Sequence, residues 1–191
     1  MKRIKTVNEI IDDIFSLYML HGDEDYIGEP VSQLEHMLQA GELARLSGAD
    51  EEEIMAAFFH DIGHLLEAEG VTVSMDGFGV ASHEHIGAEF IRSKGFSERI
   101  ALLVGSHVEA KRYLTLRRPG YYDKLSPASR HTLEFQGGKM SELEAAEFEN
   151  DPLFESKVSM RLWDDAAKET VRTKAELSYF RVLAEKLLLK N

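Results

Sequence analysis

The residues best suited to chemistry are histidines and aspartates, beginning with a pair near the middle of the chain. His60 and Asp61 are adjacent and His64 follows shortly after, so the three side chains can converge on one face of a helix. The apolar residues 56–58 precede them and predict that the group is buried. Because a buried His–Asp pair needs a partner, this spacing indicates a metal site.

Two more histidines fall where apolar residues are expected. His36 shares a predicted helical face with Met37 and Ala40. His107 follows Ile100 and Leu103 at spacings typical of a core-facing helical stripe. Either histidine alone would more simply be a hydrogen-bonded core residue. Together, beside a His–Asp pair, they favour a cluster of metal ligands.

The remaining ligand candidates are His83 and Asp164. His83 and His85 are two residues apart and cannot face the same way on a helix, so we expect at most one of them to bind metal. Asp164 lies three residues after Arg161, a spacing that equally fits an intrahelical salt bridge.

The chain contains no cysteine, so a metal has to bind to imidazole and carboxylate groups. Four imidazoles and two carboxylates suit two first-row metal ions, with Asp61 bridging them. Ligand type alone leaves iron, manganese, zinc and nickel open. The six predicted ligands are His36, His60, Asp61, His83, His107 and Asp164.

The elements that must position these residues are predicted to be helices, since amphipathic helical patterns recur and alternating strand patterns are missing. Capping boxes are expected at Asp50 with Glu53 and at Ser141 with Glu144. The predicted helices cover residues 6–20, 30–48, 50–61, 82–94, 97–116 and 126–137, a short helix from 141, one from 152 through 164, and 173–189. Residues 70–81 and 121–122 are predicted to be loops. We therefore expect an all-α helical bundle with the site between facing helices.

Composition narrows the class of protein. A length of 191 residues suits one domain. The formal charge of −12 argues against a nucleic-acid partner, because binding phosphate backbones needs a basic face. The basic residues 1–5 are followed by an apolar run that Asp12 and Asp13 interrupt, which is typical of an amphipathic helix rather than a signal peptide. We expect a soluble, cytoplasmic protein with no membrane partner.

The order of the predicted ligands along the chain resembles that of the HD-domain superfamily of metal-dependent phosphohydrolases. The inserted His83 and His107 match the dinuclear branch of that superfamily. The resemblance implies an HD-domain helical bundle with a dinuclear metal site. We expect the whole chain to form a single HD domain.

A closer resemblance covers most of the chain, including segments outside the ligands. These segments are residues 26–29 (YIGE), 33–36 (QLEH), 60–64 (HDIGH), 95–99 (GFSER), 110–114 (AKRYL), 133–138 (LEFQGG) and 161–164 (RLWD). They are similar to the HD-domain mixed-valent diiron oxygenases of the PhnZ and TmpB type, which cleave carbon–phosphorus bonds in organophosphonate catabolism.

The resemblance implies two iron ions, Fe(II) and Fe(III), with dioxygen as co-substrate. Asp61 would bridge the irons, His36, His60 and Asp164 would complete one of them, and His83 with His107 the other. The implied substrate is a 1-hydroxy-2-ammonioethylphosphonate, which is oxidised at C1 and yields phosphate. The other product is glycine from the primary amine, or glycine betaine from the trimethylated compound. An upstream hydroxylase would supply the 1-hydroxyphosphonate.

Two cations stand beside predicted ligands. Lys111 lies four residues after His107, and Arg161 three before Asp164. Such a pair suits a doubly charged phosphonate, although a solvated lysine and a salt-bridged arginine are the simpler interpretation of spacing alone. The resemblance assigns catalytic positions to Asp61, His64 and Lys111. It assigns substrate contacts to Tyr26, Glu29, Gln33, His64, Lys111, Ser129 and Arg161, with Tyr26 and Glu29 on a loop that moves when the amine arrives.

The nitrogen substituent stays open between the primary amine and the trimethylammonium group. A trimethylammonium group needs room and aromatic walls, which slightly favours the trimethylated substrate here. The candidate wall residues are Tyr26, Phe78, Tyr113, Tyr121 and Tyr122, and the small residues that would leave room are Ala81 and Ser82.

Three alternatives remain. A metal-dependent phosphohydrolase acting on a nucleotide or other phosphate ester could use the same metals to activate water, and would need no oxygen. A non-catalytic HD module would have lost its metals, which an intact ligand set argues against. An oxygenase acting on a polyol, like the inositol oxygenases, would leave the two cations without a purpose.

Overall fold

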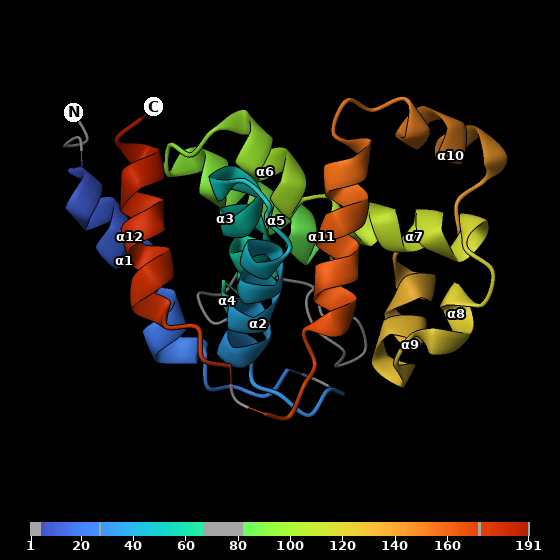
Figure 1. Ribbon diagram of the computed structural model, residues 1–191, viewed down its shortest axis with the longest axis horizontal. Coiled ribbons are helices and arrows are strands. Elements are labelled where there is room, and N and C mark those ends of the chain that lie inside the picture. The colour runs from blue at the N-terminus through green and yellow to red at the C-terminus, as the bar shows by residue number, and fades with distance from the viewer. Residues whose placement is uncertain (1–4, 27, 67–81, 172, 191) are drawn as a thin grey trace.

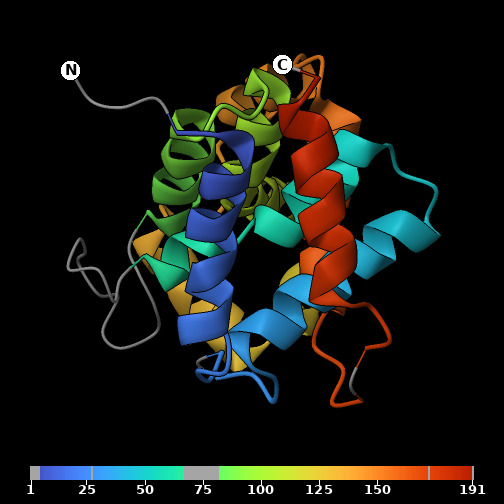
Figure 2. The ribbon, with the colours of Figure 1, turned by 90° about the vertical axis from the view of Figure 1, so that its left-hand side faces the viewer.

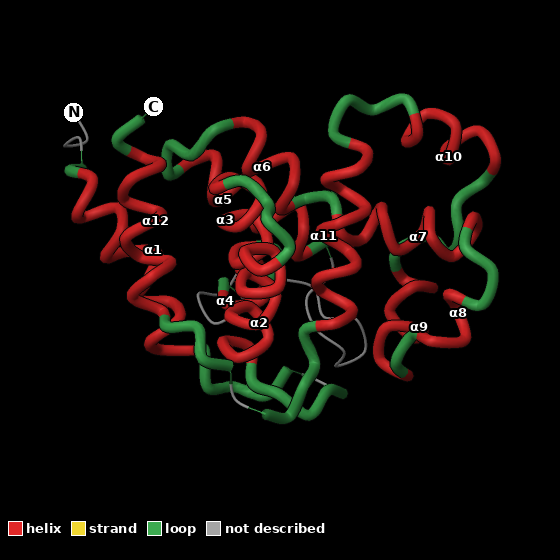
Figure 3. Tube along the Cα trace, viewed as in Figure 1, coloured by secondary structure: helices red, strands yellow, loops and turns green. Residues whose placement is uncertain are grey.

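A computed structural model describes residues 5–26, 28–66, 82–171 and 173–190 of the chain (Figure 1). Within these ranges the secondary structure is helical, without strands, and Asp25 and Ser32 form an isolated bridge (Figure 3). The prediction of an all-α fold is therefore confirmed. The predicted loop at residues 70–81 lies outside the described residues, as do Phe78 and Ala81.

The described helices, in chain order, are α1 (Val7–His21), α2 (Gln33–Leu46), α3 (Glu51–Phe59), α4 (Ile62–Leu65), α5 (His83–Ser93), α6 (Glu98–Val104), α7 (His107–Arg117), α8 (Tyr121–Lys124), α9 (Pro127–Phe135), α10 (Glu142–Glu149), α11 (Phe154–Ala166) and α12 (Leu177–Leu188). The predicted capping boxes of Asp50 with Glu53 and of Ser141 with Glu144 are both present and begin α3 and α10. None of the helices in the described ranges has both the length and the apolar character needed to cross a bilayer.

Several boundaries differ from prediction for local reasons. Helix α2 begins at Gln33 rather than Pro30, because the Ser32 hydroxyl caps it by accepting the N–H of Glu35. The predicted helix over 97–116 is divided into α6 and α7 by a break at residues 105–106. The prediction of a loop at Tyr121 is wrong, since this residue begins the short helix α8 and is buried. Helix α11 begins at Phe154, and α12 four residues later than predicted.

The core forms around α3. Helix α3 packs against α2 and α6, and α11 lies across α2 and α7. Helices α1 and α12, near the two ends of the chain, lie side by side and cover α3 on the other flank (Figures 1 and 2). Phe58 is fully buried between Tyr18 and Phe180. Its ring centroid lies 4.8 Å from that of Tyr18 and 4.3 Å from that of Phe180. This packing fixes the carboxyl end of α3, from which the candidate site begins.

Candidate metal centre and substrate cavity

The helix is interrupted at the His60–Asp61 pair. Helix α3 ends at Phe59 and α4 begins at Ile62, with Asp61 between them at φ −105° and ψ 12°. Their spacing had predicted that the two side chains lie on one continuous helix, and this prediction is wrong. The break lets each residue join a different group of side chains.

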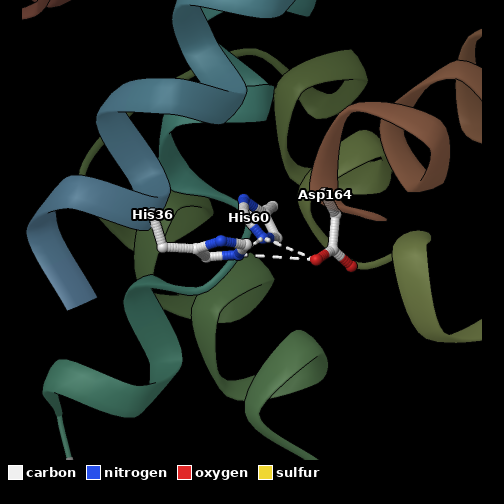
Figure 4. A group of neighbouring side chains, drawn as sticks. All are labelled: His36, His60 and Asp164. Carbon is white, nitrogen blue, oxygen red and sulfur yellow. Dashed lines mark hydrogen bonds and ion pairs between the residues drawn. The ribbon is translucent and has the colours of Figure 1, made fainter. Parts of the chain in front are cut away.

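Six buried side chains meet here in two groups of three. Figure 4 shows the first group, made by His36 of α2, His60 and Asp164 of α11. In this group the Nε2 atoms of His36 and His60 are 3.0 Å apart. The second group consists of Asp61, His83 and His107, in which the two Nε2 atoms are 2.9 Å apart. The structure thus brings together all six predicted ligands, and exposed His85 is left out.

In their neutral forms, His36 and His60 each leave the Nε2 lone pair available to a cation. The Nδ1 atom of His36 lies 2.8 Å from the carbonyl oxygen of Ala167, and that of His60 lies 2.8 Å from the carbonyl of Ala57. A carbonyl can only accept, so each Nδ1 holds the proton and donates it. Two such lone pairs 3.0 Å apart repel each other unless a proton or a metal ion lies between them. Nδ1 held by a carbonyl is the usual support of a metal-binding histidine.

The carboxylate of Asp61 faces both groups. Its Oδ2 lies 3.5 and 3.4 Å from the Nε2 atoms of His36 and His60, and its Oδ1 lies 3.3 Å from those of His83 and His107. Oδ2 of Asp61 is buried without a hydrogen-bond partner, as is Oδ1 of Asp164. Buried, unpartnered carboxylate oxygens beside imidazole lone pairs fit a pair of cations, with Asp61 as the bridge.

The electrostatics of the group agree with this fit. Burial opposes a charge on Asp61, yet His60, His36 and His83 hold the pKa of this carboxyl well below its usual value. Burial likewise opposes a charge on His36, but Asp164 and Asp61 raise its pKa to about 9. In the protein without metal, a proton on His36 would therefore balance part of the negative charge that a cation would otherwise balance.

A cavity of about 60 Å³ is lined by four of the six candidate ligands, Asp61, His83, His107 and Asp164. Its wall includes all seven residues predicted to contact substrate, namely Tyr26, Glu29, Gln33, His64, Lys111, Ser129 and Arg161. The predicted catalytic positions at Asp61, His64 and Lys111 also line it. Thr132 and Gln136 complete its polar wall. Sequence reasoning did not single out Thr132, although its position three residues after Ser129 on one helix is a signal that could have found it.

Both predicted cations are buried in this wall. The ammonium of Lys111 donates to the Thr132 hydroxyl at 3.1 Å, and burial together with nearby Arg161 lowers the pKa of Lys111 to about 7. Arg161 donates to Asp164 and Asp165 and to the hydroxyl of Tyr121. Burial opposes the charge on Arg161, but these carboxylates keep its pKa well above the usual value. One wall thus holds a permanent cation and a titratable one.

Two aromatic rings cover ligand histidines. The Tyr26 ring stacks on His36 at 4.1 Å, and burial with nearby Asp61 raises the pKa of the Tyr26 phenol well above its usual value. The His64 ring stacks on His83 at 4.0 Å. Burial and the neighbouring His83 lower the pKa of His64 to about 3, so this imidazole is neutral at neutral pH. His64 does not belong to either group of candidate ligands.

The predicted aromatic walls for a trimethylammonium group are mostly elsewhere. Tyr26 lines the cavity, but Tyr113 packs against Phe148 and Tyr121 bonds Arg161 from outside the lining. Tyr122 is exposed and lies beneath the guanidinium of Arg130.

Comparison with known proteins agrees with this geometry. The model of the HD domain family matches residues 34–145. The chain is 38% identical over 182 residues to the [1-hydroxy-2-(trimethylamino)ethyl]phosphonate dioxygenase (glycine-betaine-forming) of Leisingera caerulea, covering 95% of this chain and 92% of the relative. It is 41% identical over 164 residues to the hydroxymethylphosphonate dioxygenase of Gimesia maris, covering 86% and 81%.

A third relative is viral. The chain is 44% identical over 180 residues to an uncharacterized protein, L432, of Acanthamoeba polyphaga mimivirus, covering 94% of this chain and 80% of that protein. The family match extends over five of the six candidate ligands, from His36 to His107, and the two dioxygenases match most of the chain. The chain belongs to the HD-domain family, and within it to the group that contains these phosphonate dioxygenases.

Proposed function

We propose that this protein is an oxygenase that holds two iron ions and uses dioxygen to cleave the carbon–phosphorus bond of a 1-hydroxyphosphonate. The single observation that supports it most is the placement of Asp61, whose two carboxylate oxygens each face a separate pair of histidine Nε2 atoms. The cavity beside that carboxylate holds two cations for an anionic substrate.

The candidate iron ligands are divided as the two groups of side chains suggest. His36, His60 and Asp164 would hold one ion and His83 with His107 the other, with Asp61 shared. An imidazole and carboxylate set with open positions suits iron that activates dioxygen. When bound, the iron pair would supply the redox capacity that the side chains lack.

The side chains of the cavity would bind and orient the substrate. Arg161 and Lys111 suit the phosphonate oxygens, because guanidinium and ammonium groups form short, charge-assisted hydrogen bonds to such anions. Neutral His64 can accept a hydrogen bond from the substrate hydroxyl without adding positive charge. Tyr26, stacked on His36, shields that ligand from water.

The overall reaction balances with one dioxygen per substrate. A 1-hydroxyphosphonate and O2 give a carboxylate, hydrogen phosphate and a proton, so that C1 is oxidised as the C–P bond breaks. The product identifies the substrate: glycine betaine from the trimethylammonium compound, glycine from the primary amine, and formate from hydroxymethylphosphonate. The 1-hydroxyl group requires an earlier oxidation, so we expect an upstream hydroxylase to supply the substrate.

The test is phosphate release by the protein loaded with iron under partial reduction. Each of the three 1-hydroxyphosphonates is offered with and without oxygen, and the carboxylate product is identified. We expect oxygen-dependent phosphate in equal amount to the carboxylate, and none from Asp61→Asn. Phosphate release from phosphate esters under nitrogen, with none from the phosphonates in air, would instead establish a phosphohydrolase.

A further inference from the structure

Glu29 is the one carboxylate in the described cavity wall that is not a candidate metal ligand. Its side chain is only 7% exposed, and it already has a cationic partner. Oε1 of Glu29 accepts from the ammonium of Lys168 at 2.7 Å and from the hydroxyl of Ser126. The same ammonium lies 3.3 Å from the hydroxyl of Ser129, another wall residue.

The backbone on either side of Lys168 is held by other bonds. The carbonyl of Ala167 accepts from Nδ1 of the candidate ligand His36. The amide side chain of Gln39 bonds both the N–H and the carbonyl of Glu169, at 3.0 and 2.8 Å. The position of Lys168 is therefore set by the main chain, and its ammonium can be removed without releasing the segment from α2.

The Lys168–Glu29 pair bears directly on a cationic substrate. A cationic nitrogen taken into a buried site needs a negatively charged partner there, since an unpaired buried charge is costly. The carboxylates of Asp61 and Asp164 are committed to the candidate metal centre, which leaves Glu29. To use Glu29, the substrate nitrogen has to compete with the ammonium of Lys168. A substrate without nitrogen leaves the pair undisturbed.

Resting on the proposed function, we propose that Lys168 is a specificity-determining residue that acts as an internal counter-ion for Glu29. It disfavours 1-hydroxyphosphonates with a cationic nitrogen and favours those without one, such as hydroxymethylphosphonate. Tyr26 lines the described cavity wall but Tyr113, Tyr121 and Tyr122 do not, which supports this preference, because a trimethylammonium group is stabilised best by several aromatic surfaces.

The test compares kcat/KM for [1-hydroxy-2-(trimethylammonio)ethyl]phosphonate and hydroxymethylphosphonate in wild type and Lys168→Met. Methionine keeps an unbranched side chain and removes the charge. We expect the ratio of the two values, trimethylammonium over hydroxymethyl, to rise at least tenfold. Lys168→Arg keeps the charge and should have the wild-type ratio. Lys174→Met, at an exposed position of the same connecting segment, should leave it unchanged.

A double variant separates specificity from mere support of the fold. If Lys168 acts through Glu29, Glu29→Gln/Lys168→Met has the ratio of Glu29→Gln alone. An unchanged ratio in Lys168→Met, or one that rises equally in Lys174→Met, overturns the proposal.

Binding of both phosphonates to the iron-loaded protein under nitrogen keeps the two proposals apart. If phosphonates bind but none is cleaved in air, the proposed function fails, and the ratio of dissociation constants still tests Lys168. If wild type binds the trimethylammonium compound more tightly than hydroxymethylphosphonate, or binds neither, the assignment of Lys168 is overturned.

Discussion

Lys111 is a buried ammonium whose charge depends on pH near neutrality. Burial, together with the positive charge of Arg161, lowers its pKa to about 7. A phosphonate dianion in the cavity would instead favour the protonated form. The free enzyme therefore loses this cation as pH rises through its pKa, whereas the complex retains it.

The expected consequence is a decline of kcat/KM on the alkaline side of the pH profile. For the proposed phosphonate cleavage, kcat/KM falls as pH rises above about 7, by up to tenfold per pH unit, because it reports groups of the free enzyme. By contrast, kcat stays level over the same range, because the bound phosphonate holds the proton on Lys111. Initial rates between pH 5.5 and 9 measure both, on the substrate that the wild type cleaves.

Lys111→Met tests whether Lys111 causes this decline of kcat/KM, the descending limb of the profile. We expect a kcat/KM lowered by about a hundredfold, in line with a lost charge-assisted bond of roughly 1.5–3 kcal/mol, and no decline above pH 7. Lys139→Met at an exposed position is the matched control. A descending limb that survives in Lys111→Met would assign the titration to another group.

Whether the role of a single residue could be predicted depended on whether its neighbours in sequence reveal its position in the fold. His36 and His107 were predictable because a histidine on an apolar stripe is out of place there. His64 was expected to share a helical face with His60, but the break at Asp61 turns it onto His83 instead. The role of Lys168 could not be predicted, because its partner Glu29 is 139 residues away in sequence and nothing local links them.

At the scale of elements, the approach of α4 to α5 decides the geometry of the site. A Cβ added at Gly63 would lie 2.0 Å from the carbonyl oxygen of His83, which is a backbone atom that cannot move aside alone. Glycine at this position therefore lets the first residue of α5 reach Asp61. The close approach at Gly63 is between main-chain atoms, so the fit is sensitive to a single methyl group.

Gly63→Ala should displace α5 from the site. We expect the free energy of unfolding to fall by about 3 kcal/mol, the upper part of the range for overpacking, and the metal content to fall with it. Urea unfolding and metal analysis of the purified variant measure the two effects. Gly105→Ala is the control, since a Cβ there meets the nearest atom, Ala88 Cβ, at 3.4 Å with an ordinary helical backbone. Equal stability and metal content in both variants would contradict a close fit at Gly63.

Capping signals predicted well where helices begin, because these signals depend on neighbouring residues and not on long-range packing. The capping boxes at Asp50 and Ser141 depend on residues three apart and could be read directly. The helical turn at Tyr121, by contrast, depends on contacts with a distant element. Tyr121 is fixed by Arg161 and Asp165 of α11.

At the scale of the whole molecule, the metal centre joins distant parts of the chain. The candidate ligands come from α2, the α3–α4 junction, α5, α7 and α11. Residue spacing alone predicted which residues could meet. Their division into two groups was implied only by the family resemblance, because it depends on how α11 crosses α2 and α7. Without metal, the same packing brings two buried carboxylates and four imidazoles together without enough hydrogen bonds to satisfy them.

Metal binding should therefore stabilise the entire fold. A ligand that binds only the folded state at a hundred times its dissociation constant adds about 2.7 kcal/mol. For a chain of this size that corresponds to a rise in melting temperature of roughly 5–10 °C. We expect this rise when iron is added under nitrogen to protein stripped with a chelator, measured by differential scanning calorimetry.

Two variants show that the stabilisation comes from this centre. Asp61→Asn removes the shared carboxylate and should lose most of the rise, whereas Lys174→Met should keep it. The neighbouring histidines hold the pKa of Asp61 well below its usual value, so its charge contributes to the stability of the stripped fold at neutral pH. The stripped Asp61→Asn protein should therefore melt below stripped wild type, and the effect of iron is measured as the difference between stripped and loaded protein within each variant. Equal melting temperatures of stripped and loaded wild type would refute a metal centre at these six residues.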